Sequence, residues 1–123
     1  MDDEIDPETV RSLLDGDDAP RVVDIRSAGA FSRAHIPGSE NVPFAELPNR
    51  VESLSGADRI VTVCPHGKAS VQAARLIKSF EGTADATVES MRGGLEAWDG
   101  PLESTDAESD SDSDADEGPD APF

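Results

Sequence analysis

The sequence has one cysteine, two lysines and no long hydrophobic run. The single cysteine, Cys64, excludes a disulfide within the chain. No stretch of about 18 apolar residues is present, which excludes an ordinary transmembrane helix. The first residues also lack an apolar segment of the signal-peptide kind, so we expect a cytoplasmic protein without membrane attachment.

Basic residues are scarce as well: 10 Lys and Arg stand against 27 Asp and Glu, a formal net charge of -17. Such a surface repels phosphates, so we expect neither nucleic acid nor an anionic membrane as a partner. The lysine-poor, aspartate-rich composition is typical of proteins from a high-salt cytoplasm, where molar salt shortens the Debye length to about 3 Å. A halophilic protein should gain stability with KCl, whereas an ordinary acidic protein, the alternative, should not.

The acidic residues divide the chain into two parts. Residues 101–123 hold 9 acids and no Lys or Arg, in a Ser-, Asp- and Glu-rich run. Such a run buries too little apolar surface to offset its ordering entropy, so we expect a disordered tail; a docking or phosphorylation segment is the alternative. Residues 1–100 are long enough for one self-sufficient core, and we expect a monomer.

Apolar patterning within residues 1–100 predicts alternating strands and helices. Residues 60–63 are an apolar, β-branched run that indicates a buried strand, and residues 69–80 show helical spacing that Gly82 should end. Asp6 and Pro7 are typical of a helix start, with Asp6 as cap. Further strands are predicted near 21–25, 41–44 and 86–91, and further helices after 26, over 45–54 and after 94. This alternation predicts an α/β fold with a parallel sheet.

Cys64 lies where ligands bind in such folds, at the carboxyl end of a strand and before a glycine-containing loop. The nucleophile of a cysteine is its thiolate, and a free thiol with a pKa of about 8.5 is mainly protonated at neutral pH. Loop amides and the positive end of the following helix favour the anion, and Gly67 allows the loop to curl. The structural alternative is a small buried hydrophobic residue.

Three neighbours have candidate roles in this loop. Lys68 can bind the anionic end of a substrate, or it is a solvent-facing residue of the first helical turn. His66 can orient or protonate a leaving group, or it occupies an ordinary loop position. Ser70 can donate or accept a hydrogen bond at the rim.

Four motifs in series resemble the single-domain rhodaneses over roughly residues 5–100. They are Asp24-Ile25-Arg26, His35-Ile36-Pro37-Gly38-Ser39 with Asn41-Val42-Pro43, Cys64-Pro65-His66-Gly67-Lys68-Ala69-Ser70, and Gly93-Gly94-Leu95-Glu96-Ala97-Trp98. The resemblance implies a rhodanese-like fold, a five-stranded parallel sheet flanked by helices on both faces. It also implies a cysteine persulfide on Cys64, cradled by the amides of residues 66–70.

The sequence departs from the family pattern in the loop. Pro65 has no N–H and removes one possible donor. Ala69 stands where many thiosulfate-using members have arginine, which leaves Lys68 as the substitute cation. Outside the loop, Asp24 and Arg26 are interpreted as a structural ion pair and His35 as a hydrogen-bonded loop anchor, although all three are possible supporting residues of the site.

The resulting hypothesis is a sulfurtransferase that uses a small sulfur-containing anion such as thiosulfate, with no metal and no organic cofactor. Because no second cysteine is present, the acceptor must be external: cyanide, a small thiol or a sulfur-relay protein. One alternative is a non-enzymatic docking or redox-sensing module. Another is a cysteine phosphatase or arsenate reductase, but the sixth position after the cysteine is Ser70 rather than the arginine that grips a tetrahedral anion.

Overall fold

The fold is built on a parallel sheet in a computed structural model that describes residues 4–17 and 19–104. Within these residues the sheet has five strands in the order β1-β5-β4-β2-β3, and every neighbouring pair is parallel. The strands are β1 Glu4–Ile5, β2 Arg21–Asp24, β3 Glu40–Asn41, β4 Arg59–Val63 and β5 Thr87–Met91. The predicted five-stranded α/β fold is confirmed, and Cys64 follows the carboxyl end of the central strand, β4.

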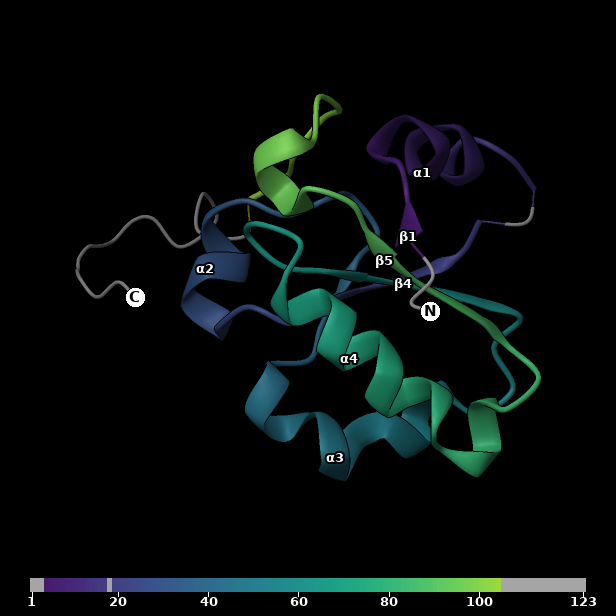
Figure 1. Cartoon of the computed structure of the whole chain (residues 1–123). Helices are drawn as coiled ribbons and strands as arrows, with labels where there is room; N and C mark the ends of the chain where they lie inside the picture. Colours follow the sequence, from purple (N-terminus) through teal and green to yellow (C-terminus); the bar gives the residue numbers. More distant parts are fainter. Residues whose placement is uncertain (1–3, 18, 105–123) are drawn as a thin grey trace.

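Helices cover both faces of the sheet, as predicted. The α-helices are α1 Pro7–Leu14, α2 Ala28–Arg33, α3 Leu47–Arg50 and α4 Ala69–Lys78. Short 3-10 helices are η1 Phe44–Glu46, η2 Val51–Leu54, η3 Glu81–Thr83 and η4 Gly94–Ala97. Figure 1 shows α3 and α4 on one side of the strands and α1 on the other.

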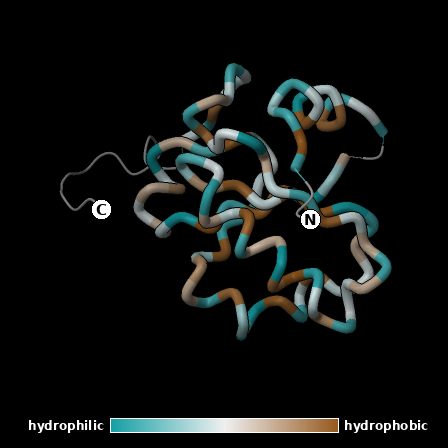
Figure 2. Tube along the Cα trace, in the orientation of Figure 1, coloured by the Kyte–Doolittle hydropathy of each residue, from teal (hydrophilic) through white to brown (hydrophobic). Residues whose placement is uncertain are grey.

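Two hydrophobic clusters fill the space between the sheet and its helices. Along β4 the side chains alternate between them, because successive residues of a strand point to opposite faces: Ile60 joins one cluster and Val61 the other. The cluster on the α4 side includes Ala73, Ile77 and Cys64. Figure 2 shows hydrophobic stretches along the strands and within the helices.

The predicted continuous helix over residues 45–54 is wrong. The segment consists of η1, α3 and η2 in succession, and only α3 is α-helical. Pro48 lies in the first turn of α3, where its missing N–H is tolerated, but it cannot donate to the carbonyl of Phe44 four residues earlier, so one continuous α-helix does not run through it. The predicted buried face survives the interruption, since Leu47, Val51 and Leu54 are all buried.

The predicted helix ends also need correction. Asp6 makes no capping hydrogen bond to α1; its carboxylate instead pairs with the Arg92 guanidinium at 2.7 Å. The central helix ends at Lys78 rather than near Gly82. Gly82 lies within η3, where a β-carbon would collide with the Ser55 side chain, so its small size serves packing.

The strand β1 was not predicted from the sequence. It has two residues, and the register with β5 pairs Glu4 with Ser90 and Ile5 with Met91. Two residues are too few to show the alternation that indicates a strand. The edge position of β1 therefore depends on β5 and not on a local signal.

The residues just beyond the predicted boundary at 100 contact the domain. Glu103 forms an antiparallel bridge with His35, and the carbonyl of Pro101 accepts a 3.0 Å hydrogen bond from the Trp98 indole. The rest of the predicted acidic tail, residues 105–123, lies outside the described residues. Across 4–17 and 19–104, none of the helices has the length and hydropathy needed to cross a bilayer.

Candidate active site

The cysteine loop, residues 64–70, connects the central strand β4 to α4, the longest of the described helices. β4 ends at Val63, Cys64 follows immediately, and α4 begins at Ala69. Gly67 turns the loop with a φ of 83°, a conformation that glycine adopts without strain. The turn brings the backbone back toward the cysteine side chain.

Three hydrogen bonds converge on the sulfur of Cys64. The N–H of Gly67 lies 3.0 Å from Sγ, and the N–H of Ser70 lies 3.3 Å from it. The Ser70 hydroxyl is the third partner, also at 3.3 Å. The Ser70 amide belongs to the first turn of α4, where backbone N–H groups have no partner within the helix. Donors from the loop and from the helix end therefore meet at one atom.

These contacts outweigh the effect of burial on the thiol. Burial alone disfavours the charged form and would raise the pKa of Cys64, but the Ser70 hydroxyl and the backbone amides of Ser70, Gly67 and His66 favour the anion. The net result is a pKa below the ordinary value of a cysteine thiol. A lowered pKa increases the thiolate fraction and hence the nucleophilicity available at neutral pH.

A second layer of hydroxyl groups lies behind Ser70. Its Oγ is 2.6 Å from the Oγ of Ser90 on β5, and its carbonyl accepts a 2.7 Å hydrogen bond from Thr62 on β4. Thr62, Ser70 and Ser90 are all completely buried. Sequence reasoning missed Thr62 and Ser90, because a small hydroxyl residue within a strand carries no pattern that indicates a site.

The segment after β5 is hydrogen-bonded to the backbone of the cysteine loop. The N–H of Leu95 donates to the Cys64 carbonyl at 2.9 Å, and the N–H of Glu96 donates to the Pro65 carbonyl at 3.1 Å. Gly94 has a φ of 65°, and a β-carbon there would overlap the Cys64 carbonyl oxygen and lie 2.6 Å from the Gly67 nitrogen. A glycine at position 94 is thus required for the two loops to touch through their backbones.

The side chains at the loop surface are charged or titratable. His66 is exposed and its Nδ1 lies 3.1 Å from a Glu96 carboxylate oxygen. Lys68 is exposed too, and it forms no ion pair with any residue that the structure describes. Within the described ranges, the amides of Lys68 and Ala69 make no hydrogen bond to the sulfur, so the structure brings together only part of the predicted cradle.

The three supporting candidates, Asp24, Arg26 and His35, make no hydrogen bond to the sulfur among the described residues. Asp24 is buried and receives hydrogen bonds from the backbone N–H and the guanidinium of Arg26, the closest at 2.7 Å. His35 is buried, stacks on Phe31 with ring centres 3.9 Å apart, and its Nδ1 contacts the Phe31 carbonyl at 2.7 Å. These contacts are an ion pair and a hydrogen-bonded loop residue, as the favoured interpretation expects, and the roles of the three residues stay a prediction.

The Cys64 side chain is almost inaccessible to solvent. The residue is 2% exposed, whereas Pro65, His66 and Lys68 of the same loop are exposed.

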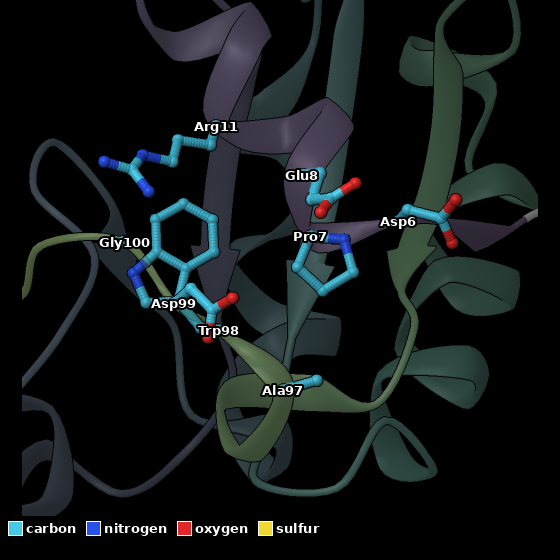
Figure 3. Close-up of a pocket in the computed structure, with 8 residues that line it drawn as sticks. All are labelled: Asp6, Pro7, Glu8, Arg11, Ala97, Trp98, Asp99 and Gly100. Carbon is cyan, nitrogen blue, oxygen red and sulfur yellow. The ribbon is translucent and has the colours of Figure 1, made fainter.

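A separate hollow of about 340 Å³ lies between α1 and η4, and Figure 3 shows Arg11 and Trp98 on one side of it. None of its lining residues belongs to the cysteine loop. No cluster of His, Cys, Asp and Glu in residues 4–17 and 19–104 is arranged to hold a metal ion.

The fold and this loop define a class of protein. A model of the rhodanese-like domain matches residues 6–100. The chain therefore belongs to the rhodanese-like family, as the four motifs indicated.

Particular relatives agree with the family. The chain is 36% identical over 87 residues to the thiosulfate sulfurtransferase GlpE of Pseudoalteromonas translucida, an alignment that covers 71% of this chain and 79% of that protein. It is 33% identical over 75 residues to YrkF of Bacillus subtilis, whose name proposes a sulfur-carrier role, covering 61% of this chain and 40% of YrkF. The chain therefore spans less than half the length of that relative.

Solved structures show the same fold. The solution structure of the rhodanese-like domain of Alr3790 from Anabaena is 26% identical, with a TM-score of 0.73 and coverage of 100% of this chain and 94% of that one. A crystal structure of a thiosulfate sulfurtransferase from Pseudomonas aeruginosa is 28% identical, with a TM-score of 0.71, and covers 85% of this chain but 20% of that one.

Proposed function

We propose that this chain is a sulfurtransferase that carries a sulfane sulfur as a persulfide on Cys64. The observation that supports it best is the convergence of two amides and one hydroxyl on Sγ, at the carboxyl end of the central strand. Such donors stabilise an anionic sulfur before, during and after transfer, because each state of the cycle carries negative charge on sulfur.

The proposed cycle has two balanced steps. The Cys64 thiolate attacks the outer sulfur of thiosulfate, an S–S bond forms as the S–S bond of the donor breaks, and sulfite leaves with the bonding electron pair. The persulfide then gives its outer sulfur to an acceptor: with cyanide, thiocyanate forms and the Cys64 thiolate returns. No net proton transfer is needed in either step, and neither step calls for a metal or an organic cofactor.

The donor and acceptor follow from the charges and the thiol count. Lys68, exposed on the loop, is the cation available for an anionic donor, and the GlpE relatives are named for thiosulfate. With Cys64 as its one cysteine, the chain needs an external acceptor, a small thiol or a sulfur-relay protein in the cytoplasm. Because Cys64 is 2% exposed, donors reach Sγ through a shift of residues 65–68.

Mass spectrometry tests the proposal directly. We expect wild-type protein incubated with thiosulfate to gain the mass of one sulfur atom on Cys64, and to lose it when cyanide is added. The variant Cys64→Ser should show neither the increment nor thiocyanate production. Thiocyanate production retained by Cys64→Ser would refute the assignment.

A second candidate is a non-enzymatic module that docks a partner or senses redox state through Cys64. The burial of the Cys64 side chain favours it, since a sealed thiol does not meet a donor. The same mass measurement separates the two: absence of an increment with every sulfane donor tried supports the module. The phosphatase alternative has less support, because the cysteine loop holds no guanidinium to grip a phosphoryl group.

A further inference from the structure

The hydroxyl of Ser90 lies behind the cysteine loop and has one partner. Its Oγ is 2.6 Å from the Ser70 Oγ, and no other side-chain hydrogen bond of Ser90 occurs among the described residues. The residue is completely buried on β5, so water does not substitute as a partner at its surface. Ser90, Ser70 and Cys64 therefore form a short chain of polar atoms that ends at the sulfur.

The protonation of the sulfur decides the direction of this chain. A thiolate only accepts hydrogen bonds, so the single proton of the Ser70 hydroxyl must be directed at Sγ across 3.3 Å. The Ser70 oxygen is then left to accept, and the Ser90 proton fills that position at 2.6 Å. Each hydroxyl proton has an acceptor, and each donation polarises the next hydroxyl.

A protonated thiol fits the same chain less well. The chain offers two contacts, Ser90 to Ser70 and Ser70 to Cys64, but a thiol brings a third proton. Whichever way the hydroxyl groups turn, one buried proton of the chain then has no acceptor within it. An unsatisfied buried donor is unfavourable, so the chain prefers the anion.

We propose that Ser90 is a positioning residue of the site, which holds the Ser70 hydroxyl in the orientation that donates to the Cys64 sulfur. This inference deepens the proposed function, because it concerns the same thiolate. Ser90 acts through Ser70 and does not itself contact the sulfur.

Other titratable groups lie on the elements around Cys64, and their contacts are not changed by a substitution at Ser90. The cysteine loop carries His66 and Lys68, η4 carries Glu96, and Asp24 and Arg26 follow the neighbouring strand β2. On β5, Glu89 pairs with Arg59. None of these side chains forms a hydrogen bond with Ser70 or Ser90 in the described part of the chain, so removal of one hydroxyl leaves their pairs intact.

The test is the pH profile of Cys64 alkylation by iodoacetamide in the full chain, which needs no sulfur donor. We expect Ser90→Ala to raise the midpoint by about half a unit, which slows alkylation about threefold at pH values below the midpoint. Ser90→Thr keeps a hydroxyl and should keep the wild-type midpoint. Ser79→Ala, which removes an exposed hydroxyl bonded to the Leu76 carbonyl, is the matched control and should also keep it.

A double-mutant cycle separates positioning from general loosening of the fold. If Ser90 acts through Ser70, then Ser90→Ala should shift the midpoint in the wild-type background and leave it unchanged in a Ser70→Ala background. An equal shift in both backgrounds, or no shift in either, would overturn the inference. Alkylation reports on the thiolate alone. A protein that fails to form a persulfide would therefore refute the proposed function without deciding whether Ser90 positions the Ser70 hydroxyl.

Discussion

Two buried polar groups stand at the ends of neighbouring parallel strands, and the protein satisfies them differently. Asp24 ends β2, Cys64 directly follows β4, and the register places Asp24 beside Val63. Asp24 is 1% exposed and Cys64 is 2% exposed. The carboxylate of Asp24 is held by the opposite charge of Arg26, whereas the sulfur of Cys64 receives hydrogen bonds from two neutral amides and lies 3.3 Å from the Ser70 hydroxyl.

This difference bears on the reactivity that we propose for Cys64. A full positive charge in bidentate contact with Asp24 compensates the charge of the carboxylate, as expected of an ion pair that holds the backbone. Neutral dipoles around Cys64 favour the anion without cancelling its charge, so the sulfur remains able to attack. On our proposal, the same end of the sheet therefore holds one group that fixes geometry and one that is available for chemistry.

The largest effect should follow from loss of the charge that compensates Asp24. Arg26→Met keeps most of the side-chain stem but leaves a buried carboxylate unpaired, and we expect it to lower the free energy of unfolding by about 3 kcal/mol. Urea denaturation measures this. Arg50→Met is the control, because Arg50 pairs with Glu46 on an exposed helix face and should change stability by at most about 0.5 kcal/mol. Equal losses in the two variants would contradict the structural role of the buried pair.

A smaller loss should follow from a β-carbon in the cysteine loop. Gly67 and Gly38 have nearly the same φ, 83° and 84°. A β-carbon at Gly67 would lie 2.7 Å from the Gly93 nitrogen, whereas a β-carbon at Gly38 would meet no atom within 4 Å. We expect Gly38→Ala to cost about 1 kcal/mol through backbone strain alone, and Gly67→Ala about 2 kcal/mol through strain and overlap. Denaturation curves give both values.

Only the variant in the cysteine loop should also affect the sulfur. We expect Gly67→Ala to slow Cys64 alkylation at neutral pH, because a displaced loop weakens the 3.0 Å contact between the Gly67 N–H and Sγ. Gly38→Ala should alkylate at the wild-type rate. A matching slowdown in both variants would mean that the effect comes from general destabilisation.

The hydroxyl donor to the sulfur should matter for reactivity more than for stability. Ser70→Ala removes one of the three contacts to Sγ, and we expect the midpoint of Cys64 alkylation to rise by about one unit, a tenfold slower reaction at neutral pH. The free energy of unfolding should fall by about 1 kcal/mol or less. A large loss of stability with an unchanged alkylation midpoint would show that Ser70 serves packing and not the thiolate.

The sequence predicted the parts of the molecule whose signals are local. The buried run at residues 60–63, the glycine loop after Cys64 and the Asp24-Arg26 pair depend on neighbouring residues, and all three lie where they were expected. The increase of stability with KCl that the acidic composition predicts stays a prediction, because the contacts within a folded protein do not show how its stability responds to salt.

The features that sequence reasoning missed depend on contacts between distant segments. β1 exists through its pairing with β5, 86 residues further along the chain by the register of Glu4 with Ser90. Ser90 reaches Ser70 across 20 residues, and Leu95 reaches the Cys64 carbonyl from the turn after β5. None of these partners has a residue type or spacing that indicates the contact, so the fold had to be known first.

The effect that needs the finest measurement is a pH dependence of stability that comes from Cys64 alone. Below its lowered folded-state pKa the thiol is protonated in both states and contributes nothing; between that value and the unfolded pKa of about 8.5 the unfolded chain binds more protons, so stability rises with pH. Each unit of difference between the two pKa values adds about 1.4 kcal/mol. We therefore expect the unfolding free energy of wild type, minus that of Cys64→Ala, to increase from mildly acidic to mildly alkaline pH in urea titrations with reductant. A difference that stays flat or falls over that range would mean that the dipoles around the sulfur do not hold an anion, and the contrast with Asp24 would fail.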